Sequence, residues 1–274
     1  MITDQQSNFL YLSEWLPKCH PTFYGEFEKV LQQYNINFKQ LSNTNDIWAV
    51  DFMPIQIEKD KFLQFVYRPD YLVNNKKKHK FITDASLACE AIGIKPIKYD
   101  IVLDGGNVIR TKDRVIMCEK VFKENKIIKK GDLIGQLKEA FQVDRITFIP
   151  QDPYDKIGHA DGMIRFLTDD TVLINEYSSE DYILKERLLT ILKYIEIPYN
   201  PYSNDKKDDA KGIYINYLQM EQTIILPIYG MEEDIVAIKQ FEELFSTNNI
   251  ATIDSKEIAL GGGILNCLSW NILK

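Results

Sequence analysis

Histidine and paired cysteines are scarce in this chain of 274 residues, and no long apolar run is present. The four cysteines (19, 89, 118 and 267) form no CxxC pair, which argues against a zinc knuckle or a disulfide framework and predicts reduced thiols. No window approaches ~18 uncharged apolar residues, and the N-terminus lacks the basic and apolar regions of a signal peptide. We therefore expect a soluble, cytoplasmic protein that does not bind membranes.

The chain also lacks an excess of positive charge. Its formal net charge is −7 and its pI is about 5.2, which argues against a nucleic-acid surface and mildly favours a cationic partner. With 45% hydrophobic residues, a chain of this length can bury a sizeable core without splitting in two. We expect one catalytic domain over residues 1–274.

Amphipathic helix patterns, each followed by a short β-rich run, recur five times along the chain. The predicted helices are Phe23–Tyr34, Asp84–Gly93 with Asp84 as N-cap, Asp132–Phe141, Glu180–Tyr194 and Glu233–Phe245. Their starts are spaced by roughly 50 residues, close to the ~40–50 residue period of propeller-like repeats. The pattern favours five α/β modules closed into a ring, a fivefold pseudosymmetric α/β propeller, with an open α/β sheet as the alternative.

Two Gly-rich segments, IVLDGGNVI (101–109) and IALGGGILN (258–266), resemble each other and predict a strand, a glycine turn and a second strand. Two charge-dense segments, 76–80 and 204–212, carry no apolar period and predict exposed connections. Either connection is a candidate lid over the centre of the ring.

Cys267 follows three consecutive glycines in ALGGGILNCLSW. Glycines let the backbone turn and approach a ligand closely, so we expect this thiol to be displayed. The alternative is a small buried hydrophobe, the role of most free cysteines. A thiol with a pKa near ~8.5 needs help to ionise at neutral pH, and a cationic substrate beside it would supply that help.

Three other polar stretches interrupt apolar runs. Asp51 follows the strand-like IWAV, and Asp104 stands before two glycines; a turn or cap residue is the alternative for both. In GHADGMIRF, period two in a strand would place His159 and Asp161 on one face. Because the other histidines lie beside Pro21 or within the lysine run, His159 is the candidate proton carrier. A metal site is disfavoured for want of a second histidine.

In a site that holds a thiol, an imidazole and two or three carboxylates, the carboxylates repel one another unless a cation binds between them. A guanidinium suits such a cluster, because it stays charged and its planar N–H donors pair with carboxylates.

NDIWAVDFMP, VLDGGN, GHADG, TIILPIYG and GGGILNC, in their order along the chain, resemble the guanidine-modifying enzymes of the pentein superfamily. The likeness is closest to the agmatine deiminase and bacterial peptidylarginine deiminase branch. It implies a propeller with an axial active site, with Cys267 as nucleophile, His159 as general acid and base, and Asp51 and Asp161 as guanidinium-binding carboxylates. It places Asp104, Trp48 and Asn216 at substrate-binding positions; core packing is the alternative for Trp48 and Asn216.

The chain departs from the family pattern at three positions. Val50 and Met53 stand where relatives have Arg and Gly, which puts recognition of the far end of the substrate in question. Asn266 stands where agmatine deiminases have His beside the cysteine.

We therefore expect hydrolytic deimination of agmatine, arginine or peptidyl-arginine, without metal or organic cofactor, through a covalent thiouronium on Cys267. An amidinotransferase or a methylarginine hydrolase on the same fold is one alternative, and a weakly catalytic arginine-binding protein is another. A homodimer is also left open.

Overall fold

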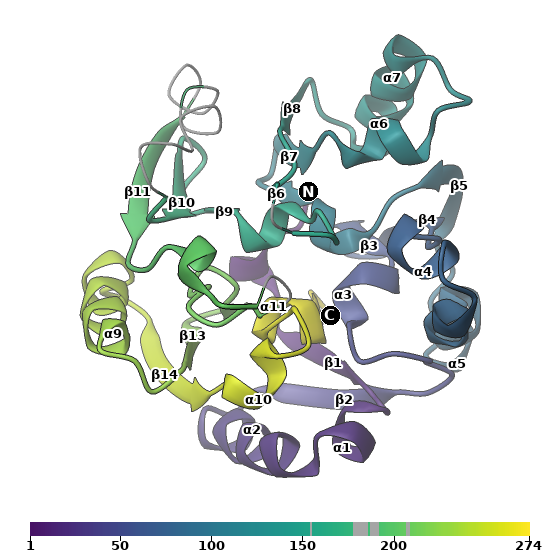
Figure 1. Cartoon of the computed structure of the whole chain (residues 1–274). Helices are drawn as coiled ribbons and strands as arrows, with labels where there is room; N and C mark the ends of the chain where they lie inside the picture. Colours follow the sequence, from purple (N-terminus) through teal and green to yellow (C-terminus); the bar gives the residue numbers. More distant parts are fainter. Residues whose placement is uncertain (154, 178–185, 187–191, 207–208) are drawn as a thin grey trace.

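Five three-stranded sheets surround a common centre in the computed structural model of the protein (Figure 1). The structure describes residues 1–153, 155–177, 186, 192–206 and 209–274. In every sheet the middle strand pairs antiparallel with one neighbour and parallel with the other. The predicted five-module α/β propeller is confirmed, and the open-sheet alternative is wrong.

The first sheet closes the ring, because it combines both ends of the chain. Phe9 of its middle strand lies opposite Ile272, and Asn8 exchanges hydrogen bonds with Lys274. The sheets are β15–β1–β2 (Ser269–Ile272, Phe9–Ser13, Asn37–Leu41), β3–β4–β5 (Ile55–Glu58, Lys61–Val66, Ile97–Val102), β6–β7–β8 (Ile109–Arg110, Arg114–Cys118, Arg145–Ile149), β9–β10–β11 (Ile164–Phe166, Thr171–Asn175, Lys193–Ile197) and β12–β13–β14 (Leu218–Met220, Thr223–Ile228, Asn249–Asp254).

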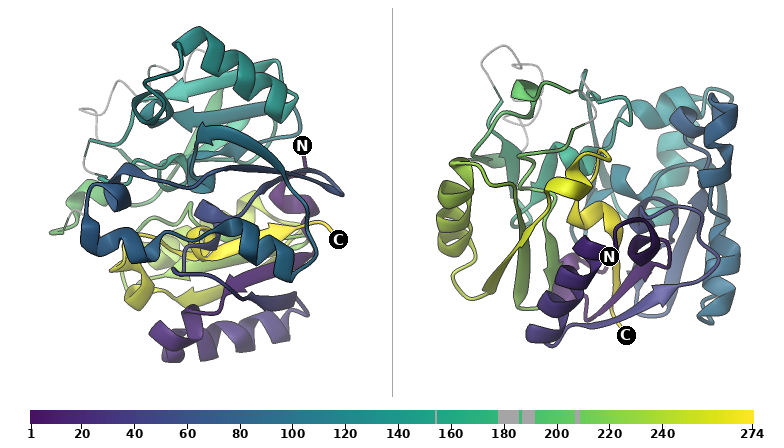
Figure 2. Two further views of the ribbon diagram at one scale, coloured as in Figure 1. Left: turned by 90° about the vertical axis from the view of Figure 1, so that its right-hand side faces the viewer. Right: turned by 60° about the horizontal axis from the view of Figure 1, so that its bottom comes forward.

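The longer helices lie on the crossovers between parallel strands, outside the ring of sheets (Figures 1 and 2). In α2 (Pro21–Gln33) the residues Phe23, Phe27 and Leu31 are buried. The helical spacing of Phe27, Val30 and Leu31 predicts an apolar stripe, of which Val30 is only partly buried. The other three are α5 (Ala85–Ala91), α7 (Lys130–Phe141) and α9 (Glu233–Leu244). Asp84 caps α5 through a hydrogen bond from the Ser86 amide. Four of the five predicted helices are thus confirmed.

Short helical turns occupy the connections. They are α1 (Leu16–Cys19), α3 (Ala49–Phe52), α4 (Asp70–Val73), α6 (Lys120–Glu124), α10 (Lys256–Ala259) and α11 (Leu265–Leu268), with 3-10 turns η1 (Asp4–Gln6), η2 (Lys76–Phe81), η3 (Gly105–Asn107), η4 (Ala160–Gly162) and η6 (Pro201–Ser203). The turns α3 and α11 lie near the centre of the ring (Figure 1).

Three predicted strands are helical turns instead. Residues 47–50 lead into α3, whose first turn contains Asp51. His159 precedes η4 as its N-cap and Asp161 lies within η4, and the strand begins only at Ile164. The segment 258–266 forms a helix, a glycine turn and a second helix, unlike 101–109, where strand, turn and strand are as predicted. Several amides of these segments bond within their own turn, including those of Asp51, Met163 and Gly261, as expected of connections outside a strand ladder.

The fourth predicted helix falls mostly on residues outside the described part of the chain. Its predicted end is wrong, because Lys193 and Tyr194 belong to β11. They pair in parallel with Thr171 and Val172, and this ladder satisfies their backbone groups.

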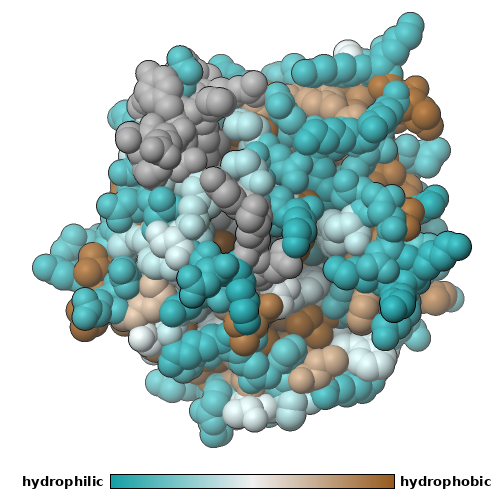
Figure 3. Space-filling model, in the orientation of Figure 1, coloured by the Kyte–Doolittle hydropathy of each residue, from teal (hydrophilic) through white to brown (hydrophobic). Residues whose placement is uncertain are grey.

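No helix in the described ranges is long and apolar enough to cross a membrane. The face of the molecule in Figure 3 is mostly hydrophilic outside the atoms shown in grey.

Candidate active site

A cavity of about 920 Å³ opens at the centre of the ring. Six of the seven predicted site residues line it: Trp48, Asp51, His159, Asp161, Asn216 and Cys267. They come from α3, η4, α11 and the segment before β12, that is, from distant parts of the chain. Asp104, the seventh, is buried beside the cavity and is not part of its lining.

Gly106 marks the point on which the polar groups converge. A Cβ built on this glycine would lie 2.5 Å from Asp51 Oδ1, 2.8 Å from His159 Nδ1 and 3.3 Å from Asp161 Oδ2. The Gly106 amide donates a 3.1 Å hydrogen bond to Asp51 Oδ1. Any side chain here would displace all three groups, so this position needs glycine for close approach.

The thiol of Cys267 lies against Asp161 and Asn216. Its Sγ donates to Asp161 Oδ2 at 3.3 Å and accepts from Asn216 Nδ2 at 3.3 Å. The Asn216 side-chain oxygen accepts from the backbone amides of Asn266 and Cys267, which holds the start of α11 in place. Cys267 is buried, as the hydrophobe alternative requires, and it also lines the cavity. It is therefore packed rather than displayed, yet its sulfur faces the site.

His159 is held from both sides by carboxylates. Its Nε2 lies 2.8 Å from Asp104 Oδ2, and its Nδ1 lies 3.4 Å from Asp51 Oδ1. Lys120 Nζ donates to the same Asp104 oxygen at 2.8 Å. Of these two carboxylates, Asp51 lines the cavity and Asp104 does not, so His159 meets the cavity-lining acid through Nδ1.

The glycine turn before Cys267 packs against the indole of Trp48. A Cβ on Gly263 would lie 2.7 Å from Trp48 Cζ3 and 3.0 Å from Cys267 Cβ, and one on Gly261 would lie 3.1 Å from Trp48 Cζ2. The glycines therefore allow the cavity wall and the cysteine to approach each other. Trp48 is half-buried and contributes this wall.

Burial and neighbouring charges displace the titrations of these groups. Burial, with Asp161 and Asp104 nearby, raises the pKa of Asp51 to about 7 although His159 opposes the shift. Burial alone would lower the pKa of His159, but Asp51 and the hydrogen bond to Asp104 raise it to about 9. Burial, then Asp161 and Asp51, raise the pKa of the Cys267 thiol well above its ordinary value. The cavity therefore gathers carboxylates around a thiol whose raised pKa keeps it protonated at neutral pH.

Acidic side chains also surround the mouth of the cavity. The charged residues that line it outside the centre are Asp46, Asp70, Asp152, Asp155, Asp205 and Asp209, with Lys78, Lys156 and Lys206. Lys78 comes from the predicted connection 76–80, which forms η2, and Asp205, Lys206 and Asp209 come from 204–212. Both predicted connections thus reach the rim, apart from residues 207–208, which lie outside the described residues.

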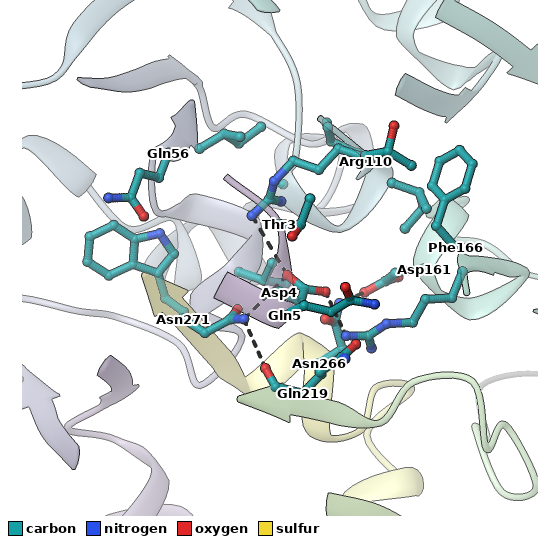
Figure 4. Close-up of a pocket in the computed structure, with 18 of the residues that line it drawn as sticks. Thr3, Asp4, Gln5, Gln56, Arg110, Asp161, Phe166, Gln219, Asn266 and Asn271 are labelled. Atoms are coloured by element: carbon teal, nitrogen blue, oxygen red, sulfur yellow. Dashed lines mark hydrogen bonds and ion pairs between the residues drawn. The ribbon is translucent and has the colours of Figure 1, made fainter. Parts of the chain in front are cut away.

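A second cavity, of about 370 Å³, lies on the other side of Asp161 (Figure 4). There Asp4 accepts from Arg165 Nη2 at 2.7 Å and from Asn271 Nδ2 at 3.3 Å, with Arg110 Nη2 3.8 Å away. Val50 and Met53, two of the departures from the family pattern, line this second cavity and not the first. The third, Asn266, donates to Asp161 Oδ2 at 2.8 Å.

Sequence reasoning missed Lys120 and Tyr71. Lys120 sits in the charged run EKVFKEN, where nothing distinguishes it from an exposed lysine. The ring of Tyr71 meets that of His159 edge-on at 6.1 Å. Among the described residues, no group of three or more His, Cys, Asp or Glu side chains is placed to hold a metal ion.

Comparison with known proteins agrees with this architecture. The solved agmatine deiminase of C. jejuni superposes with a TM-score of 0.81 over 100% of this chain and 95% of that one, at 21% identity. A variant of that enzyme with substrate bound gives 0.79, over 100% and 96% of the two chains and also at 21% identity. A dimethylarginine dimethylaminohydrolase gives 0.62 at 11% identity, over 97% and 100%. The chain has the fold of these guanidine-modifying enzymes.

The sequence model of the Porphyromonas-type peptidyl-arginine deiminases matches residues 21–272, which include every residue of the site described above. The protein therefore belongs to the Porphyromonas-type peptidyl-arginine deiminase family of the pentein superfamily.

Proposed function

We propose that this protein hydrolyses the guanidine of an arginine-like substrate to the ureido product and ammonia, with Cys267 as the nucleophile. The observation that carries the proposal is that one thiol, one imidazole and two carboxylates line a single cavity, with the carboxylates and the imidazole beside Gly106 and the thiol against Asp161. These are the groups that covalent deimination of a flat cation requires.

Asp51 and Asp161 would bind the guanidinium. Their oxygens both lie close to the Gly106 position, and both are buried, so a planar cation with several N–H donors can pair with them away from water. The raised pKa of Asp51 supports this role, because a buried carboxylate short of positive charge favours a cationic ligand.

The substrate would also activate the thiol. Before substrate binds, burial and the charges of Asp161 and Asp51 keep Cys267 protonated, as its raised pKa indicates. A guanidinium between these carboxylates neutralises them and places positive charge beside the sulfur, which favours loss of the thiol proton. The thiolate then adds to the central carbon of the guanidinium.

His159 would move the protons. With a pKa of about 9 it is an imidazolium at neutral pH and can protonate the departing amino group, so that the C–N bond breaks and ammonia leaves. The S-alkylthiouronium remains. The neutral imidazole then takes a proton from water, and the hydroxide adds to the thiouronium carbon. The C–S bond breaks to release the ureido product, and the hydroxyl proton passes to the sulfur and regenerates the thiol.

The acidic mouth supports agmatine or peptidyl-arginine over free arginine as substrate. Six aspartates and three lysines line the mouth, and no arginine is among the described lining residues. The α-carboxylate of free arginine would meet this negative field, whereas the ammonium of agmatine or the neutral backbone of a peptide would not.

Cys267→Ala tests the proposal. We expect ammonia release to fall to background while calorimetric binding of the substrate persists, because the carboxylates remain. Cys89→Ala, which removes a buried thiol of α5 that does not line the cavity, is the matched control and should keep activity. Undiminished turnover without the Cys267 thiol would refute the assignment.

Product analysis separates the alternatives. Agmatine, arginine, an arginine peptide and methylated arginine are supplied with and without an acceptor amine. A ureido product with ammonia supports the deiminase, an amidino group on the acceptor indicates a transferase, and a methylamine product indicates a methylarginine hydrolase. Binding without turnover of any of them indicates an arginine-binding protein.

A further inference from the structure

A buried lysine stands behind the catalytic imidazole. Lys120 of α6 is 2% exposed, and its ammonium lies 2.8 Å from Asp104 Oδ2, 3.3 Å from Glu124 Oε1 and 4.0 Å from Asp70 Oδ1. It also sits 4.8 Å above the ring of Tyr71. Lysine is rarely buried this fully, and desolvation of its charge must be offset by close partners. None of the steps above uses this residue.

Lys120 and His159 share one oxygen atom. Both Lys120 Nζ and His159 Nε2 lie 2.8 Å from Asp104 Oδ2, while Asp104 Oδ1 is buried without a hydrogen-bond partner. A single carboxylate therefore faces two groups that can each carry a positive charge. Lys120 stays positively charged and remains paired with the Asp104 carboxylate, because Asp104 and Glu124 outweigh desolvation and raise the pKa of Lys120.

We propose that Lys120 is a positioning residue that neutralises Asp104, so that Asp51 becomes the carboxylate on which protonation of His159 depends. The proposal rests on the assignment of His159 as the acid and base of the reaction. It adds a residue outside the cavity that sets when this acid gives up its proton.

The groups that face His159 support this division of roles. Asp51 approaches Nδ1 from α3, and Asp104, just before η3, approaches Nε2. Lys120 reaches Asp104 from α6, the Tyr71 ring edge comes from α4, and Asp161 belongs to the histidine's own turn. After burial, Asp51 is the largest influence on the pKa of His159 and raises it; the hydrogen bond to Asp104 also raises this pKa, and Lys120 lowers it. Burial keeps the pKa of Tyr71 far above neutrality, so this phenol stays uncharged.

Substrate binding would then release the proton. Once the guanidinium pairs with Asp51, that carboxylate no longer stabilises the imidazolium, and Asp104 is already paired with Lys120. The Nδ1 proton can pass to the leaving amino group of the substrate, and the neutral ring that results is the base needed for the attack of water. Without Lys120, Asp104 would serve His159 as a full counterion, and the imidazolium would persist into the second step.

The test is direct titration of the ring by NMR in the protein labelled at histidine, without substrate. The chain has only three histidines, so His20 and His79 serve as internal references. In Lys120→Met we expect the His159 titration to move up by about one to two pH units, because a neighbouring positive charge is lost. Lys123→Met, on the exposed part of the same helix, should leave it unchanged.

Glu124→Gln keeps the proposal testable if Lys120→Met does not fold. This change removes one of the carboxylates that pair with Lys120, so the ammonium interacts more strongly with Asp104. The pKa of His159 should therefore fall, because Glu124 carries its charge above pH 7 in the wild type. An unchanged His159 titration in Lys120→Met, or a downward one, overturns the proposal. If Lys120→Met is unfolded, the proposal is overturned when the pKa of His159 fails to fall in Glu124→Gln.

Turnover provides a second readout. At neutral pH, Lys120→Met should accumulate the thiouronium adduct on Cys267, seen as a mass increase of the intact protein, because its imidazolium is slow to become a base. The ring titration stands whatever the enzyme acts on. A chain that turns over no guanidine but shows the predicted shift would refute the proposed function and leave the role of Lys120 intact.

Discussion

Asp161 lines both cavities, and the two cavities differ in whether the chain itself neutralises their carboxylates. In the smaller one, Asp4 lies between Arg165 and Arg110, so the chain supplies both the acid and its cations (Figure 4). In the larger one, Asp161 contacts an amide and a thiol and makes no ion pair within the described part of the chain. Burial and neighbouring carboxylates give Asp51 there a raised pKa.

The difference shows how one fold separates structure from chemistry. A self-neutralised cluster is stable without a ligand, and here it joins η1 to β15 and β9. A cluster short of positive charge costs stability when empty and gains it when a cation enters, which is what a binding site requires.

Replacing an aspartate with asparagine should affect activity in the larger cavity and stability in the smaller one. Asp161→Asn removes a carboxylate that would bind the guanidinium and should lower kcat/KM by roughly 10³-fold, because a buried charge pair is broken in the transition state. Asp4→Asn should leave kcat/KM within about threefold and lower the free energy of unfolding by about 1–3 kcal/mol, because Arg165 and Arg110 lose their partner.

Steady-state kinetics and urea denaturation of both variants check this contrast. Wild-type kcat/KM at equal folded fraction is the reference. If Asp4→Asn lost as much activity as Asp161→Asn, the smaller cavity would take part in the reaction and the division drawn here would be wrong.

A single methyl group at the convergence point should have the next largest effect. In Gly106→Ala the new Cβ would lie 2.5 Å from Asp51 Oδ1 and 2.8 Å from His159 Nδ1, which is closer than van der Waals contact allows. Displacement of these groups should lower kcat by about 10²-fold, as misplacement of reacting groups by about 1 Å does.

Gly135→Ala is the matched change away from the site. This glycine is exposed in α7, and nothing lies within 4 Å of its Cβ position. We expect unchanged activity and about 0.5–1 kcal/mol of added stability from the better helix propensity of alanine. Full activity in Gly106→Ala would show that the three side chains tolerate rearrangement.

The pH dependence of kcat/KM in the wild type should reflect the larger cavity. Activity should rise as Asp51 ionises near pH 7 and fall as His159 loses its proton above about pH 9. On each limb the change approaches tenfold per pH unit. A profile flat from pH 6 to 10 would contradict both assignments.

The smaller cavity should respond to acid and not to alkali. Burial raises the pKa of Asp4, but Arg165 and Arg110 outweigh it, so the net shift is downward. Its contribution to stability is therefore complete above the unfolded pKa of ~3.9 and is lost as the pH falls through the lower folded value. Asp4→Asn should accordingly be less sensitive to acid than the wild type, and acid titration monitored by circular dichroism measures this. Equal acid sensitivity of the two proteins would contradict it.

Much of the architecture could be read from the sequence because its signals are local. The stripe of Phe27, Val30 and Leu31, the capping residue Asp84 and the repeat of helix and strand all depend on neighbours within a few residues. The site residues could be named because four motifs in order resemble a family. Their local conformation could not, since α3, η4 and α11 are single turns whose shape depends on what they pack against.

Lys120 illustrates what local signals omit. In the sequence it is one charge among several in a short helix, and its burial depends on Asp104, sixteen positions earlier, and on the Tyr71 ring. The position of Asp104 behind His159, outside the cavity lining, likewise depends on how two modules meet.

The sequence by itself determined the five modules, four of their helices and the chemical character of the residues at the centre, because apolar period and side-chain type are properties of short segments. Only the tertiary structure decided which atoms face one another: that Nδ1 of His159 lies beside Asp51, that Gly106 leaves room for three side chains, and that Asp4 pairs with Arg165 in the smaller cavity. Those relations join residues far apart in the chain, and only packing of the modules around one axis brings them within hydrogen-bonding distance.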